Sequence, residues 1–253
     1  MSAKTVEELL RKLRLSTAAN ELNTVLTESG SNASLSWVVN LLQREVDARA
    51  EKFLQNKVVR SQMPELKSIE DFDWNFNHAI NKEKIMDIAE LNFINEREIV
   101  LFLGQPGTGK SHLAQAIGFK AIYHGKTVYW SSLKKLAEEI LKAKHKGDLS
   151  RLFKRILSCD LWILDDWAVV SLSRDVSEEV FDLLDRRKHS TSMLLTSNRD
   201  VGEWPEVFVD PVIASAAIDR IFDRANVVIF NGPTYRGKGK KDKRVAKISE
   251  LKV

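Results

Sequence analysis

The residues with the clearest chemistry are Gly104 to Ser111, GQPGTGKS, which match the pattern G-x-x-x-x-G-K-[ST] directly after the apolar run Ile99–Leu103. In this pattern the glycines, here Gly104 and Gly109, allow a tight turn that points backbone N–H groups at phosphate. Lys110 reaches the β- and γ-phosphates, and the Ser111 hydroxyl ligates Mg²⁺. The other candidate nucleotide contacts are Gln105, Pro106, Gly107, Thr108 and His112. An ordinary Gly-rich turn is the alternative.

Carboxylates end a second apolar run, LWILDD, at Leu161–Asp166. In P-loop enzymes the first acid, here Asp165, holds the Mg²⁺ shell with Ser111, and the next, Asp166, can polarise the attacking water. The alternative is a strand that simply ends in a turn. A third run, SMLLTSN, ends in Asn198, which we expect beside the γ-phosphate, where it could orient water.

Strands and helices that alternate must position these groups. We predict strands at 99–103, 127–130, 161–166, 192–198 and 227–230, and helices at 77–94, 111–123, 132–157 (broken near Gly147) and 177–188. This alternation predicts an α/β fold with a parallel sheet of five strands and right-handed crossovers.

A helical domain is predicted at 1–60. It contains two apolar stripes, at Leu9–Leu15 and Leu35–Val46, with a turn at 28–33 and an N-cap at Thr5. DNA binding and self-assembly are both open as its role. Residues 61–75 are predicted to form a linker into an ATPase core at 76–236. In this linker Phe72 and Trp74 either pack against adenine or anchor the linker on the core.

Basic residues are concentrated in the predicted helices at 132–157, where three acids accompany eight of them. Such a run is either a solvated face or a DNA contact. The tail at 237–253 is also basic, and we expect it to be flexible and attracted to polyanions. The DNA-binding candidates are Lys134, Lys135, Lys142, Lys144, Lys146, Arg151, Lys154 and Arg155.

Composition excludes several classes of protein. The single cysteine, Cys159, excludes an internal disulfide framework and fits a small hydrophobe at a strand start in a reducing compartment. No run approaches the ~20 apolar residues of a membrane span. A net charge of +4 and 43% hydrophobic residues fit a globular chain. We therefore expect a soluble, cytoplasmic protein without a membrane partner.

Taken together, these motifs make the chain resemble AAA+ ATPases of the IstB/DnaC group. The resemblance also includes the EDFDW linker and the block TSNRDVGEWPEVFVDPVIASAAIDRIFDRANVVIFNGPTYR, which is closer to the transposition helpers than to the helicase loaders. It implies that Asn198 is the sensor-1 residue, that Arg220 is an arginine finger for a neighbouring subunit's ATP, and that Arg236 is a terminal sensor arginine binding nucleotide. It also implies that the basic insert grips DNA. The alternative for Arg220 is a local surface pair with Asp219 or Asp223.

Two features depart from that family pattern. Asp166 stands where many AAA+ enzymes have glutamate, so we expect slow hydrolysis, stimulated by DNA or a partner. The sequence also continues only about 20 residues past the fifth strand, so we expect no full C-terminal lid domain.

The resemblance implies a Mg²⁺-dependent ATPase that forms a homo-oligomer on duplex DNA, with little sequence preference, and selects or presents target DNA to a transposase, which it stimulates. One alternative is a helicase loader with the same site. The other is a nucleotide-gated assembly module with negligible hydrolysis.

Overall fold

The computed structural model describes residues 3–28, 36–188 and 190–235. The chain divides into two compact units, 1–56 and 57–253. None of the described helices is long and apolar enough to cross a membrane.

The first unit is helical and consists of α1 (Ala3–Lys12), α2 (Ser16–Glu28) and most of α3 (Ser36–Ser61). Its core contains Val6, Leu9, Leu10, Ala19 and Val39. The predicted N-cap at Thr5 is wrong, because α1 already includes Ala3. The predicted turn falls mostly on 29–33, outside the described residues. Past Val46 the helix continues to Ser61, because Ala, Arg, Glu, Lys and Gln are strong helix formers.

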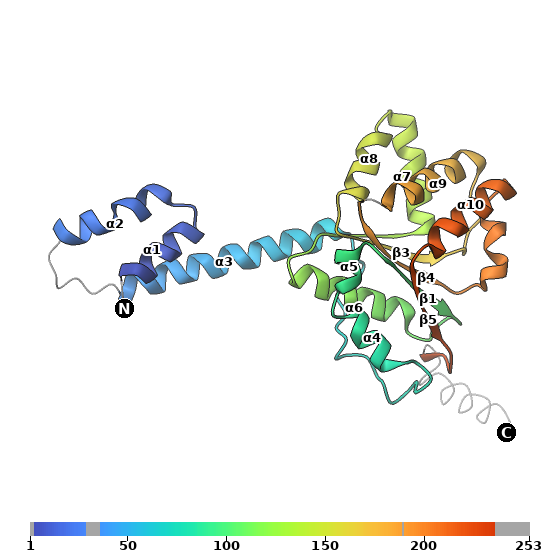
Figure 1. Cartoon of the computed structure of the whole chain (residues 1–253), viewed down its shortest axis with the longest axis horizontal. Helices are drawn as coiled ribbons and strands as arrows, with labels where there is room; N and C mark the ends of the chain where they lie inside the picture. Colours follow the sequence, from blue (N-terminus) through green and yellow to red (C-terminus); the bar gives the residue numbers. More distant parts are fainter. Residues whose placement is uncertain (1–2, 29–35, 189, 236–253) are drawn as a thin grey trace, which may run out of the picture. The chain divides into compact units, whose positions relative to one another are not determined.

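The second unit is built on five parallel strands in the order β2-β3-β4-β1-β5 (Figure 1), which confirms the predicted α/β fold. Their central residues are almost completely buried, as expected for strands covered on both faces. The strands are β1 (Ile99–Gly104), β2 (Val128–Ser132), β3 (Leu161–Trp167), β4 (Ser192–Ser197) and β5 (Ala225–Phe230).

Helices cover both faces of this sheet, with α7 to α10 on one side and α4 to α6 on the other (Figure 1). The first layer packs on alternate strand residues such as Leu101, Trp162 and Leu195. In the second layer, Gly118 of α6 faces Ile163, the neighbour of Trp162. These helices are α4 (Lys82–Ile88), α5 (Asn92–Glu96), α6 (Lys110–Tyr123), α7 (Leu133–Lys146), α8 (Leu149–Leu157), α9 (Arg174–Arg187) and α10 (Pro211–Phe222), with the 3₁₀ helix η1 (Val201–Val207) before α10.

One predicted helix, 77–94, is wrong as a single element. Asn77 is buried and donates from Nδ2 to the Asn231 carbonyl (2.8 Å), so its segment does not become helical. α4 starts only after Asn81, whose side chain caps it, and Leu91 (φ 66°) separates α4 from α5. The predicted break near Gly147 is confirmed, since Gly147 (φ 70°) ends α7.

The sheet order brings the functional ends of three strands together. β1 pairs with β4, with Leu103 opposite Ser197, and β4 pairs with β3. Since all the strands run in the same direction, the loop after β1 and the carboxyl ends of β3 and β4 meet at one edge. Between β5 and Tyr235 the described chain contains no α-helix, and residues 236–253 lie outside the description.

Gly104 is the position where this sheet tolerates no side chain. Its φ is 144°, and an added Cβ would overlap the Phe230 backbone carbonyl of β5. We expect Gly104→Ala to lower the free energy of unfolding by at least about 2 kcal/mol, because it combines a strained backbone with overpacking. Urea unfolding monitored by circular dichroism measures this.

Gly202→Ala is the control for this substitution, because a Cβ there meets nothing within 4 Å. Equal unfolding midpoints for the two variants would contradict the assigned β1–β5 packing.

Candidate functional site

The phosphate-binding loop joins β1 to α6. Gly104, Gly107 and Gly109 all have positive φ (144°, 80° and 107°), and α6 starts at Lys110. The Lys110 side chain is buried, and its Nζ donates to the Gly104 and Gln105 carbonyls, both at 2.7 Å. This arrangement directs an ammonium group and a helix N-terminus at the same point, which is a site for an anion.

Asp165, at the end of β3, receives hydrogen bonds from two other elements. The Ser111 hydroxyl donates to Asp165 Oδ1 (2.9 Å), and so does the hydroxyl of Thr196 from β4. Burial raises the pKa of Asp165 above its usual range, and the Thr196 hydrogen bond opposes this rise. The structure therefore joins the two predicted metal ligands.

These oxygen donors fit Mg²⁺. A hydroxyl and a carboxylate are hard ligands, and Mg²⁺ in nucleotide sites takes most of its other ligands from phosphates and water. Within the described part of the chain no three His, Cys, Asp or Glu side chains are grouped to hold a metal ion by themselves. The residues present thus suit a metal that arrives with a triphosphate.

Asp166 and Asn198 also meet, since Asn198 Nδ2 donates to Asp166 Oδ1 (3.1 Å). Asp166 has φ 54°, a left-handed conformation that is uncommon for residues other than glycine. Its N–H donates to Thr196 Oγ1 (3.1 Å). Thr196 was missed by the sequence analysis. The detectable signal was its position two residues before Asn198, which places both side chains on one face of a strand.

The predicted linker lies against the phosphate-binding loop. A Cβ at Gly109 would be 2.5 Å from the Phe72 ring, and His112 Nε2 is 3.2 Å from the Ser68 carbonyl. Tyr235 donates its N–H to the Gly107 carbonyl (2.8 Å) and packs edge-on against Phe76. Tyr235 and Phe76 were not predicted as site residues from the sequence.

These segments enclose a cavity of about 410 Å³ beside the loop. Phe72 lines it, whereas Trp74 packs against Phe72 and Lys82 and is not among the lining residues. Arg236 lies outside the described residues. The cavity is lined by Leu66, Lys67, Asp71, Phe72, Asp73, Phe76, Asn77, Thr108, Gly109, His112 and Tyr235.

Arg220 lies elsewhere on the unit, on α10. Its Nε binds Asp185 of α9 (2.6 Å) and its Nη1 binds the adjacent Asp219 (3.0 Å). Asp223, the other local partner considered, binds Lys188 instead (2.7 Å). Arg187 also supports this corner, because its Nη2 donates to the Arg220 carbonyl (3.3 Å), and burial lowers its pKa to about 10.

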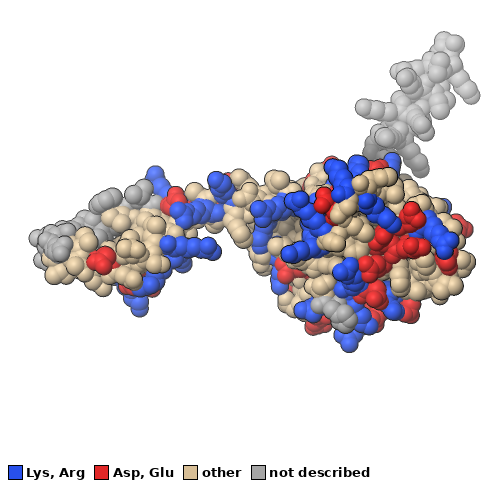
Figure 2. Space-filling model, turned by 90° about the horizontal axis from the view of Figure 1, so that it is seen from above, with Lys and Arg blue, Asp and Glu red and all other residues tan. Residues whose placement is uncertain are grey.

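The eight basic candidates of α7 and α8 separate into three groups. Lys142, Lys146, Arg151, Lys154 and Arg155 line a groove of about 580 Å³, together with Glu139 and Asp148. Lys144 lies on another side of α7 and binds Glu179 of α9 (2.9 Å). Lys134 and Lys135 are exposed near the start of α7 and are not among the groove residues. Figure 2 shows patches of Lys and Arg separated by a band of Asp and Glu.

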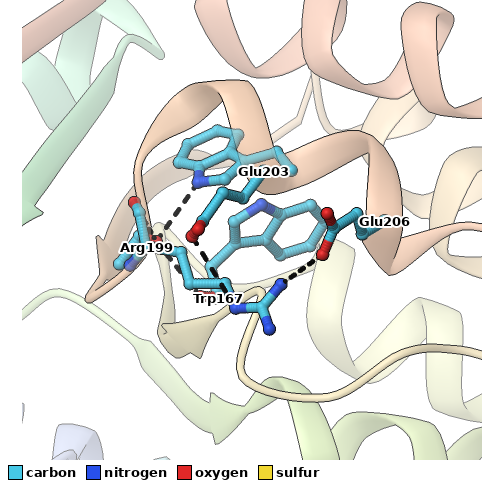
Figure 3. A network of polar contacts seen from close by, with 6 residues as sticks. Trp167, Arg199, Glu203 and Glu206 are labelled. Atoms are coloured by element: carbon cyan, nitrogen blue, oxygen red, sulfur yellow. Dashed lines mark hydrogen bonds and ion pairs between the residues drawn. The ribbon is translucent and has the colours of Figure 1, made fainter.

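The residues that come after Asn198 in the sequence form a network of polar contacts (Figure 3). Arg199 lies between Glu206 (2.9 Å) and Glu203 (3.9 Å), both from η1. Trp204 Nε1 donates to Ser197 Oγ (3.2 Å), and the Trp204 ring packs on Trp167. None of these contacts was predicted from the sequence. They attach η1 to the strand end that carries Asn198.

Comparisons with known proteins agree with this geometry. The family model described as IstB-like ATP binding protein matches residues 6–243. A protein of insertion sequence IS21 from Pseudomonas aeruginosa, described as ATP-binding, is 30% identical over 93% of this chain and 90% of its own length. Its counterpart in IS232 of Bacillus thuringiensis subsp. berliner is 33% identical over 90% of this chain and 92% of its own length.

Two solved structures share the fold. The crystal structure of DnaI matches with a TM-score of 0.54 and 21% identity. The match covers 66% of this chain and 89% of the DnaI chain. AMPPCP-bound DnaA from Aquifex aeolicus has a TM-score of 0.57 at 22% identity, over 72% of this chain and 55% of its own.

Lys110 provides a direct test of the phosphate site. We expect Lys110→Ala to weaken ATP binding about 100-fold, because the charge nearest the β- and γ-phosphates is lost. Titration with a fluorescent ATP analogue measures the affinity. Lys120→Ala, on the same helix, is the matched control, since Lys120 pairs at the surface with Glu90 (3.7 Å).

Wild-type nucleotide affinity in Lys110→Ala would refute the assignment of this loop. Asp166→Asn is a second control. We expect this variant to retain nucleotide binding, because it still contains Ser111 and Asp165.

Proposed function

This chain belongs to the family of IstB-like ATP-binding proteins, and from that premise we propose that it is a DNA-stimulated ATPase that assembles on duplex DNA and presents it to a transposase. The observation that carries the proposal is the meeting of Ser111, Asp165, Asp166 and Asn198 at one edge of the sheet. This is the donor set that hydrolysis of a Mg²⁺-bound triphosphate requires.

Each of these groups has a role in the proposed reaction. Lys110 and the N-terminus of α6 bind the β- and γ-phosphates, and Ser111 with Asp165 would hold Mg²⁺, which when bound neutralises charge on the phosphates. Asp166 accepts a hydrogen bond from the attacking water, and Asn198 holds the Asp166 carboxylate (3.1 Å). Since an aspartate reaches less far than a glutamate, we propose slow turnover in the absence of DNA.

We propose that adenine binds in the cavity beside Gly109. Its position next to the phosphate-binding loop and the Phe72 ring on its wall support this, as aromatic faces stack on bases. Trp74 then acts on the base only by supporting Phe72 (ring centroids 4.7 Å apart). We also propose that Arg236, the next residue in the sequence after Tyr235, contributes to this site.

The proposed DNA contact is the groove between α7 and α8. Five cations against two acids line it, and they come from two helices, so an extended phosphate backbone can contact several at once. All five of these side chains can contact phosphates, which carry no sequence information, and this supports sequence-tolerant binding. For the helical first unit, DNA contact and self-assembly both stay proposals.

The choice of a transposase as partner rests on relatives that are named for insertion sequences. The proposed compartment is the cytoplasm. A helicase loader would instead retain a replicative helicase in a pull-down. A nucleotide-gated assembly module would show no steady-state ATPase activity with or without DNA.

The groove can be tested through the salt dependence of DNA binding. We expect replacement of Lys142, Lys146 and Arg151 by Gln to flatten the slope of log K against log salt by up to about 2.7 for duplex DNA, since each neutralised phosphate contributes about 0.9. Fluorescence anisotropy over a salt series, with a non-hydrolysable ATP analogue, measures the slope.

The matched control replaces Lys134, Lys135 and Lys144 by Gln, which removes the same charge from α7 outside the groove. If both triple variants flatten the slope equally, net charge and not the groove explains DNA binding. An unchanged slope in the groove variant identifies α7 and α8 as an ordinary solvated face.

Arg220 tests whether the working unit is an oligomer. We expect Arg220→Ala to bind ATP but to lose about 10³-fold in turnover, the lower end of the effect of an arginine that stabilises transferred phosphate. Mixing it with Lys110→Ala restores activity, because one subunit contributes the arginine and the other the phosphate site. A mixture that forms joint assemblies yet stays inactive would refute the role in trans.

A further inference from the structure

The last two residues of β4, Thr196 and Ser197, and the next residue, Asn198, hold the end of β3. Thr196 contacts Asp165 and Asp166, the Ser197 hydroxyl contacts the Trp167 carbonyl (3.2 Å), and Asn198 contacts the Asp166 carboxylate. The register between the two strands shifts at this point, between Leu164 and Trp167. Asp165 is opposite Ser132 of β2, but both aspartates lie in the irregular part of the β3–β4 ladder, where pairing with β4 does not fix them.

Asp166 in particular needs an external support. Its left-handed backbone (φ 54°) costs about 1–2 kcal/mol relative to an ordinary strand conformation. Its N–H donates to Thr196 Oγ1 of the neighbouring strand (3.1 Å). The side chains on either side of this N–H, those of Asp165 and Asp166, are the two carboxylates of the site.

The Thr196 hydroxyl is buried (1% exposed) and uses both of its functions at once. It donates its proton to Asp165 Oδ1 and accepts the Asp166 N–H (3.1 Å). One oxygen atom thereby sets the direction of the proposed metal-ligating carboxylate and the backbone of the proposed water-orienting residue.

We propose that Thr196 is the positioning residue of the site, acting through Asp165 on Mg²⁺ and through Asp166 on the attacking water. The inference rests on the proposed ATPase function. Thr196 itself touches neither nucleotide nor metal in this proposal. It acts as a support whose loss leaves the ligands present but misdirected, and such supports commonly change metal affinity or activity by about 10- to 100-fold.

The test is Thr196→Val, which keeps the shape and removes the hydroxyl. We expect the Mg²⁺ concentration for half-maximal binding of a fluorescent ATP analogue to rise about tenfold and kcat to fall about 10- to 100-fold. Thr196→Ser keeps the hydroxyl and restores both quantities. This rescue separates positioning from simple loss of packing.

Thr191→Val is the matched control. Thr191 immediately precedes the same strand and is equally buried. Its hydroxyl donates to the Cys159 carbonyl (2.5 Å) at the opposite end of the sheet. We expect it to lose stability in urea unfolding without changing the Mg²⁺ dependence or kcat.

Wild-type Mg²⁺ dependence and kcat in Thr196→Val would overturn the proposal, and so would equal losses in Thr191→Val. A wild-type chain that binds Mg²⁺ and nucleotide but never hydrolyses it would overturn the ATPase function alone. In that case the Mg²⁺ titration still decides the role of Thr196.

Discussion

The hydrogen bonds that converge on Asp165 are the interaction on which the site depends. They come from Ser111 at the start of α6 and from Thr196 of β4. One buried carboxylate at the end of β3 thus links this strand to α6 and β4. Burial disfavours the charged form of this group, and only the donors around it and a bound cation can offset that cost. The parallel sheet order is what brings these donors within reach, because it places the ends of β3, β4 and β1 side by side.

The same order explains which parts of the structure the sequence could predict. Each strand is an apolar run, and each is followed by polar residues at the edge where ligands bind in parallel sheets. Such patterns are local, so the five strands and the partners Ser111, Asp165, Asp166 and Asn198 were found from spacing alone. The prediction of a single helix at 77–94 was wrong because of a contact between residues far apart in the sequence. Asn77 is held by Asn231, far along the chain, and that contact leaves no trace in the periodicity of the segment.

Charged pairs show the same limit. Lys144 belongs to a basic run in the sequence, but its ammonium faces Glu179 of another helix. Arg220 was considered with its sequence neighbours Asp219 and Asp223, whereas the shorter contact is to Asp185 of α9 (2.6 Å). Composition counts charges and cannot assign them to a face. A helix with about 3.6 residues per turn places Lys142 and Lys146 on one side and Lys144 on another, and only the packed neighbour decides which side remains open.

These ion pairs also bear on how the protein could work. The pair between Arg220 (36% exposed) and Asp185 (51% exposed) contributes little to stability, because water screens both groups. An arginine held that weakly can exchange its carboxylate for the phosphate of a neighbouring subunit at little cost. Asp165 differs from this pair, because it is buried and its contacts join α6, β3 and β4. The proposed chemistry therefore rests on fixed groups, and the proposed assembly rests on exchangeable ones.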